Sequence, residues 1–136
     1  IVCLHMRLGD HKTSKNLKIF SEISLNYYQN AISIFKKKFS NPIFILFSDQ
    51  LEKAKDILEN NSDLMPSSIF NLKSEHDFQL MSLCDSYIFS NSTFSLWAAY
   101  LSNKEKIYFT KPSSWYKNPV IEKTNKYYLD NWVYLN

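Results

Sequence analysis

The chain has 136 residues, of which 45% are hydrophobic and 21% charged, and it carries a net charge of +3. No stretch reaches the roughly 18 consecutive apolar residues of a membrane span, and so small a charge gives little reason to expect a nucleic-acid partner. We therefore expect residues 1–136 to form a single globular domain. Because Ile1-Val2-Cys3-Leu4 already has the pattern of a strand, we expect this domain to be part of a longer protein.

The first half of the chain alternates between apolar runs and amphipathic segments. The expected order is a strand over 1–8, a polar loop over 11–18, a helix over 25–39, a strand over 42–47 and a helix over 50–59. The break at Gly9-Asp10 is typical of a buried strand that runs into a loop. Ser48-Asp49 closes the second apolar run, and we expect this pair to cap the helix that follows.

The second half continues the same alternation with shorter elements. The expected order is a weak strand over 69–72, a helix over 77–83, a strand over 86–90, a helix over 92–101 and a strand over 106–110. The tail from residue 111 onward is rich in aromatic side chains and has no clear period. The alternation of strands and helices predicts an α/β fold with a parallel sheet.

The rare residue types narrow the chemistry. Gly9 is the only glycine, which excludes a glycine-rich phosphate loop. Cys3 and Cys84 are the two cysteines, and their spacing predicts reduced core residues. The chain contains no Asp-x-Asp pair, so we expect no divalent metal. The basic run over 36–38 is interpreted as a helix end, where cations interact favourably with the last carbonyl groups.

The end of the first strand is the first candidate for a binding site, because ligands of parallel α/β sheets bind beyond the carboxyl ends of the strands. His5 and Arg7 are two residues apart and share one face of the strand, while Asp10 lies in the turn beyond. The planar guanidinium of Arg7 suits a phosphate. An internal ion pair between Arg7 and Asp10 explains the same residues, and both readings stay open.

The second candidate is the start of the helix at 92–101. Asn91, Ser92, Thr93, Phe94 and Ser95 bring three hydroxyl groups to a helix start, where backbone N–H groups and the positive dipole end favour an anion. Helix capping would explain only one of these hydroxyls. Asp77 is weaker evidence, because an acidic residue in the first turn of a helix is common.

Four segments together resemble glycosyltransferase family 11, the family of bacterial α-1,2-fucosyltransferases. His5-Met6-Arg7-Leu8-Gly9-Asp10 is similar to the family's His-x-Arg-Arg-Gly-Asp motif. The segments 77–84 and 91–101 resemble its D-[LF]-x-L-M-S-x-C and A-N-S-[ST]-F-S-W-W-[AG]-A-W-L block, and Pro112 and Trp115 resemble its P-x-x-W. Leu8 stands where the family has its second arginine, and Leu96 where it has the first Trp of a pair.

The resemblance implies a GT-B enzyme, of which this chain would be the Rossmann-like C-terminal half without the N-terminal acceptor-side domain. On the family's pattern, His5 and Asp77 contact the guanine and ribose of GDP-fucose, and Arg7 contacts the β-phosphate. Ser92, Thr93, Phe94 and Ser95 contact the phosphates through backbone and hydroxyl groups, and Asn91 belongs to the same donor-binding site.

The reaction implied by the resemblance is transfer of L-fucose from GDP-fucose to the 2-hydroxyl of a galactose-terminated glycan, with inversion and without a metal or other cofactor. Arg7 would stabilise the leaving diphosphate. Asp10 is the only nearby candidate for the general base, although a carboxylate beside an arginine is a poor base and a role in orienting Arg7 explains it as well. A cytoplasmic location is implied, with peripheral contact to the inner face of a bacterial membrane left open.

Three other interpretations fit parts of the sequence. A sister enzyme, an α-1,6- or protein O-fucosyltransferase, would share His5 and Arg7 and differ in its acceptor. A truncated domain could bind GDP without catalysis. The order of elements alone also allows a flavodoxin-like signalling domain.

Overall fold

Six parallel strands form one sheet in a computed structural model that describes residues 1–9, 16–59, 61–70, 74–124 and 127–136. The strands are β1 (Val2–Met6), β2 (Phe44–Ser48), β3 (Leu64–Pro66), β4 (Ser86–Ile88), β5 (Tyr108–Thr110) and β6 (Val133–Tyr134). Their order across the sheet is β3-β2-β1-β4-β5-β6. This order is that of a Rossmann-like sheet, whereas a flavodoxin-like sheet has the order 2-1-3-4-5. The flavodoxin-like interpretation is therefore wrong.

Strand β1 lies in the middle of the sheet because its side chains are apolar enough to be buried on both faces. Its Val2 pairs with Phe44 of β2 on one side and with Ser86 of β4 on the other. Alternate side chains enter two separate cores, with Cys3 in one and Leu4 in the other. The two cysteines are free and buried, as the sequence predicted.

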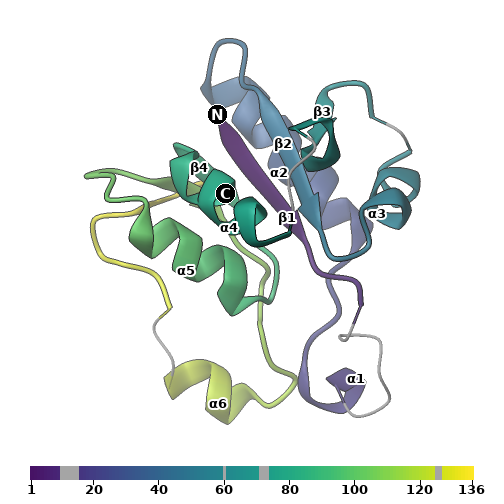
Figure 1. The fold of residues 1–136 in the computed structure, drawn as a ribbon. Helices are drawn as coiled ribbons and strands as arrows, with labels where there is room; N and C mark the ends of the chain where they lie inside the picture. The colour runs from purple at the N-terminus through teal and green to yellow at the C-terminus, as the bar shows by residue number, and fades with distance from the viewer. Residues whose placement is uncertain (10–15, 60, 71–73, 125–126) are drawn as a thin grey trace.

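Helices cover both faces of the sheet (Figure 1). Side chains of α2 (Leu25–Lys38) and α3 (Leu51–Ile57) pack with Leu4 on one face. Side chains of α4 (Ser74–Leu83) and α5 (Thr93–Leu101) pack with Cys3 on the other. Figure 1 places the short helices α1 (Asn16–Ile19) and α6 (Pro119–Thr124) beyond the carboxyl end of β1. No helix in these described ranges has the length and apolar character needed to cross a bilayer.

The main helices begin and end close to their predicted positions. The Oγ of Ser24 accepts a hydrogen bond from the backbone N–H of Tyr27 at the start of α2, and the basic run 36–38 fills its last turn. Ser92 caps α5 in the same way by accepting from the N–H of Phe94. The basic run is therefore at a helix end, as predicted.

The third strand differs from the prediction. Strand β3 is Leu64–Pro66, and Ile69 and Phe70 belong to a 3₁₀ helix, Ser67–Phe70, with their side chains exposed. The rest of the predicted strand, 71–72, lies outside the described residues. Because β3 is an edge strand, it tolerates a proline that would break a central one.

The tail adds β6 to the sheet and covers one of the two cores with aromatic rings. The backbone N–H of Val133 donates to the carbonyl of Ile107 at 2.7 Å. Tyr128 stacks on Phe109 at a ring distance of 4.7 Å, and Trp132 is buried beside them. This aromatic packing has no helical or strand period, which is why the sequence pattern did not reveal it.

Candidate functional site

A cavity of about 330 Å³ opens at the carboxyl ends of β1 and β2, beneath the first turns of α4 and α5. Its lining consists of His5, Arg7, Phe47, Ser48, Asp49, Glu75, Asp77, Met81 and Phe94. We call it the first cavity. Four of the residues predicted from the sequence, His5, Arg7, Asp77 and Phe94, therefore meet in one place although they come from three different elements.

His5 is a buried wall of the first cavity, and two serines hold its ring. Its Nδ1 lies 3.0 Å from the Oγ of Ser95 and 3.1 Å from the Oγ of Ser90. The Ser95 hydroxyl also lies 3.5 Å from the carbonyl oxygen of Ser92, which ties this contact to the first turn of α5. The two hydroxyls hold the ring in one orientation in the wall of the first cavity.

Arg7 is half-buried and pairs with Asp49 at the end of the neighbouring strand. The Nε of Arg7 lies 3.4 Å from Oδ2 of Asp49. The same carboxylate accepts hydrogen bonds from the backbone N–H groups of Leu8 and Gly9, both at 2.9 Å. Asp49 therefore fixes both the start of the loop after β1 and the side chain that the sequence predicted to bind phosphate.

Gly9 is needed at this point for space. A Cβ atom on residue 9 would collide with Oδ2 of Asp49 and lie 3.3 Å from its Cγ. The φ angle of Gly9 is not positive, so the backbone conformation itself would admit other residues. The single glycine of the chain thus allows the close approach of an internal carboxylate.

Asp77 lies in the first turns of α4 and faces the first cavity together with Glu75. Burial raises the pKa of Asp77 above its ordinary value, and a hydrogen bond from the buried hydroxyl of Ser67 partly opposes this effect. A half-buried carboxylate of this kind is well placed to accept hydrogen bonds from the N–H groups of a ligand.

The start of α5 supplies the remaining predicted residues. Ser92 caps the helix, Ser95 supports His5, and the ring of Phe94 packs edge-on against Phe78 at 5.1 Å. Thr93 is exposed in the first turn. One hydroxyl is therefore explained by capping and one by a buried hydrogen bond.

Asn91 has a different environment from its neighbours. Its side chain is buried, and its Nδ2 donates to the carbonyl groups of Ser21 at 2.8 Å and Trp115 at 3.3 Å. Among the described residues its Oδ1 has no hydrogen-bond partner. The side chain holds two distant segments against the turn between β4 and α5. A contact between Asn91 and a nucleotide-sugar donor stays a prediction.

The sequence predicted roles for Asp10 and an ion pair for Arg7, and the structure bears on only the second. Asp10 lies outside the described residues, so its predicted roles as base or as partner of Arg7 stay predictions. The pairing of Arg7 with Asp49 was missed, because Ser48-Asp49 had been interpreted as a helix cap. The Oγ of Ser48 does accept from the N–H of Gln50, whereas the N-cap residue of α3 is Gln50 and has no side-chain cap.

No group of three or more metal-ligating side chains occurs in the described part of the chain. The charged groups of the first cavity are the guanidinium of Arg7 and the carboxyl groups of Asp49, Glu75 and Asp77. The guanidinium of Arg7, which Asp49 partly offsets, and the start of α5 are the groups here that suit an anion, while the carboxyl groups on α4 suit a group that donates hydrogen bonds.

Comparison with known proteins shows the family of the chain. The family model described as Glycosyl transferase family 11 matches residues 1–136. The chain belongs to glycosyltransferase family 11. His5, Arg7, Asp77 and Phe94, which line the first cavity, come from the segments in which the sequence resembles this family.

Relatives within glycosyltransferase family 11 come from bacteria and mammals. An α-1,2-colitosyltransferase of Escherichia coli is 33% identical over 120 residues, which cover 85% of this chain and 41% of that protein. The O-antigen biosynthesis glycosyltransferase WbnK of Escherichia coli is 29% identical over 136 residues, covering 97% and 43%. Galactoside α-(1,2)-fucosyltransferase 2 of Bos taurus is 29% identical over 138 residues, covering 97% and 40%.

The chain thus spans about two fifths of the length of these relatives. No solved structure matches it significantly.

Proposed function

We propose that this chain is the donor-binding part of a GT-B fucosyltransferase, which moves L-fucose from GDP-fucose to the 2-hydroxyl of a galactoside. The transfer proceeds with inversion and without a metal. The observation that carries the proposal is the meeting of Arg7 and Asp77 in one cavity beside the start of α5, in a chain of glycosyltransferase family 11. The cytoplasmic location, with peripheral contact to the membrane, belongs to the same proposal.

The two ends of the first cavity suit the two ends of GDP. Guanine presents an N–H and an adjacent amino group, and a carboxylate such as that of Asp77 accepts from both. Adenine lacks this pair of donors. His5 lines the same cavity and suits the ribose, while the proposed place of the diphosphate is at Arg7 and the first turn of α5.

The chemistry is breakage of the bond between the fucose anomeric carbon and the β-phosphate oxygen, with the electron pair leaving on GDP. The acceptor 2-hydroxyl oxygen bonds to the anomeric carbon from the opposite face, and its proton passes to a base. Arg7 and the N–H groups of α5 stabilise the charge that grows on the leaving diphosphate, each good donor contributing about 3 kcal/mol in a site that excludes water. Asp10 stays the candidate base in this proposal.

Calorimetric titration tests the donor site. We expect the chain to bind GDP more tightly than ADP or UDP, and to do so equally well in EDTA. Arg7→Ala should weaken GDP binding at least about tenfold, the effect of losing one charge-assisted hydrogen bond. In the complete enzyme it should lower turnover by a factor of about 100 or more. Lys53→Ala, which removes an exposed cation from α3, is the control and should change neither.

Two results would contradict the proposal. A folded chain that binds all three nucleotides alike, or none of them, lacks the proposed guanine site. Near-normal turnover in Arg7→Ala would remove Arg7 from leaving-group stabilisation, whatever the affinity for GDP.

Colitose is a second candidate for the transferred sugar, because the α-1,2-colitosyltransferase of Escherichia coli is 33% identical to the chain. The guanine and phosphate contacts would be unchanged under this alternative. Turnover measured with the two sugar nucleotides in competition decides between them, and a preference for the colitose donor would replace fucose in the proposal.

A further inference from the structure

A second cavity, of about 450 Å³, adjoins the first at Arg7. Its walls are Met6 and Leu8 at the end of β1, Glu22 and neighbouring residues in the segment before α2, and Tyr28 in the first turn of that helix. Arg7 lines both cavities. A volume of this size is within the range of roughly 300–1,000 Å³ in which proteins bury small ligands.

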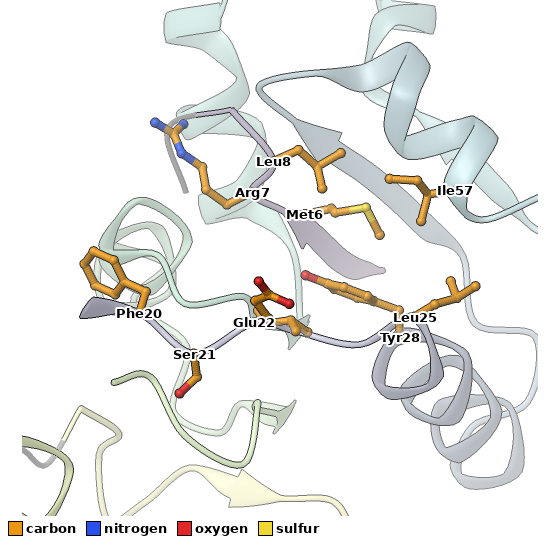
Figure 2. Close-up of a pocket in the computed structure, with 10 residues that line it drawn as sticks. Met6, Arg7, Leu8, Phe20, Ser21, Glu22, Leu25, Tyr28 and Ile57 are labelled. Carbon is orange, nitrogen blue, oxygen red and sulfur yellow. The ribbon is translucent and has the colours of Figure 1, made fainter. Parts of the chain in front are cut away.

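The walls of the second cavity are mainly apolar, with a few polar groups directed inward. Figure 2 shows the carboxyl group of Glu22 and the hydroxyl end of Tyr28 converging beneath Met6 and Leu8. The same view shows the guanidinium of Arg7 directed away from Tyr28. Apolar walls with a small number of placed polar groups fit a ligand that has both an apolar face and hydroxyl groups.

Fucose has this character, since it is a deoxyhexose with a methyl group on one edge of its ring and hydroxyl groups on the others. If the diphosphate lies at Arg7 and the guanosine extends toward Asp77, the sugar must extend from Arg7 in another direction. The second cavity begins at Arg7, and Leu8 adds an apolar wall there. We propose that the second cavity binds the deoxyhexose of the donor, with Glu22 accepting hydrogen bonds from its hydroxyl groups and Met6 facing its ring.

This inference rests on the proposed function, because it takes the position of the diphosphate from it. The outer wall of the cavity is firmly attached. The segment 19–21 pairs with the segment 115–117 through hydrogen bonds from Ser21 N–H to Trp115 and from Lys117 N–H to Ile19. Asn91 holds both segments to the turn before α5. The sugar pocket and the phosphate site are thereby fixed to one another.

The methionines of the chain provide a direct test, because there are three and each reports on a different place. Met81 lines the first cavity, Met6 lines the second, and Met65 lies in the edge strand β3. With ¹³C-labelled methionine methyl groups, GDP should shift the NMR signal of Met81 alone. GDP-fucose should shift both Met81 and Met6, and Met65 should not move with either nucleotide.

The outcomes separate the inference from the proposed function. If GDP-fucose shifts the NMR signal of Met81 and not that of Met6, the nucleotide site stands and the sugar binds elsewhere, which overturns the inference. If GDP alone shifts the Met6 signal as far as GDP-fucose does, the second cavity binds part of the nucleotide and the inference is also wrong. If neither GDP nor GDP-fucose shifts the Met81 signal, the proposed function itself is contradicted.

Glu22→Gln provides an independent measurement. We expect its affinity for GDP to match that of the wild type, and its affinity for GDP-fucose to fall about tenfold, the effect of losing one charge-assisted hydrogen bond. Glu105→Gln, at an exposed position before β5, is the matched control and should change neither affinity. Equal loss for both nucleotides, or no loss for GDP-fucose, would show that Glu22 does not contact the sugar.

Discussion

Replacing Gly9 by alanine tests the close contact between the first loop and Asp49. The added Cβ would collide with Oδ2 of Asp49, and this carboxylate cannot move freely because Leu8, Gly9 and Arg7 all bind it. A hydrogen bond to a charged group contributes about 1.5–3 kcal/mol. Displacing Asp49 by enough to lose one of these bonds should therefore lower the free energy of unfolding by about 2 kcal/mol.

A double-mutant cycle separates this contact from other effects of the substitutions. Asp49→Ala should itself destabilise the chain, because two backbone N–H groups and Arg7 lose their acceptor. In that background Gly9→Ala meets no carboxylate, and its own cost should nearly disappear. We expect a coupling of at least about 1 kcal/mol between the two substitutions, which is well above the error of such cycles.

Urea unfolding is a suitable assay, because Trp115 and Trp132 are buried and their fluorescence reports on the core. Asp56→Ala, an exposed position on α3, is the control and should change stability by less than about 0.5 kcal/mol. Strictly additive effects of Gly9→Ala and Asp49→Ala, or a neutral Gly9→Ala, would refute the reasoning.

Two further substitutions test the supports of the site. Asn91→Ala should lower the free energy of unfolding by about 2 kcal/mol, because it removes a buried donor to two carbonyls. It should also speed amide hydrogen exchange at Ser21, and unchanged exchange there would argue against the bracing role. Asp77→Asn removes a carboxyl group whose pKa is raised above its ordinary value by burial. The folded wild type holds the proton of this carboxyl group more tightly than the unfolded chain does. The free energy of unfolding of the wild type should therefore fall as the pH rises from the ordinary pKa of an aspartate to the raised pKa of Asp77. Relative to wild type, the variant should gain stability over the same window in urea unfolding, and a constant or opposite difference would contradict the cause assigned to the shift.

The sequence predicted strands best where both faces of the strand are buried. Strands β1 and β2 are buried on both faces, so their apolar runs stand out from the surrounding residues. Strand β3 has three residues, of which none is fully buried, and the more apolar Ile69 and Phe70 nearby attracted the prediction to the wrong segment. Short edge strands carry too few buried side chains to be recognised from their pattern.

The same limit applies to the site. His5 and Arg7 could be predicted because they lie at the carboxyl end of a recognisable strand. The role of Asp49 could not, since its partners Leu8 and Gly9 are 41 and 40 residues away and a local role as a cap explained it equally well. The bracing role of Asn91 likewise depends on a carbonyl group 70 residues away. Pattern and spacing identify which edge of the sheet carries the chemistry, whereas contacts between distant segments need the folded chain.

The use of the only glycine has a consequence for how such domains are recognised. Many Rossmann-like domains have several glycines after the first strand, where the backbone approaches a pyrophosphate. Here the glycine in the equivalent loop approaches Asp49, and the same carboxylate pairs with the side chain of Arg7. A search for glycine-rich fingerprints would therefore pass over this domain, and a search for an arginine held by a carboxylate on the neighbouring strand would find it.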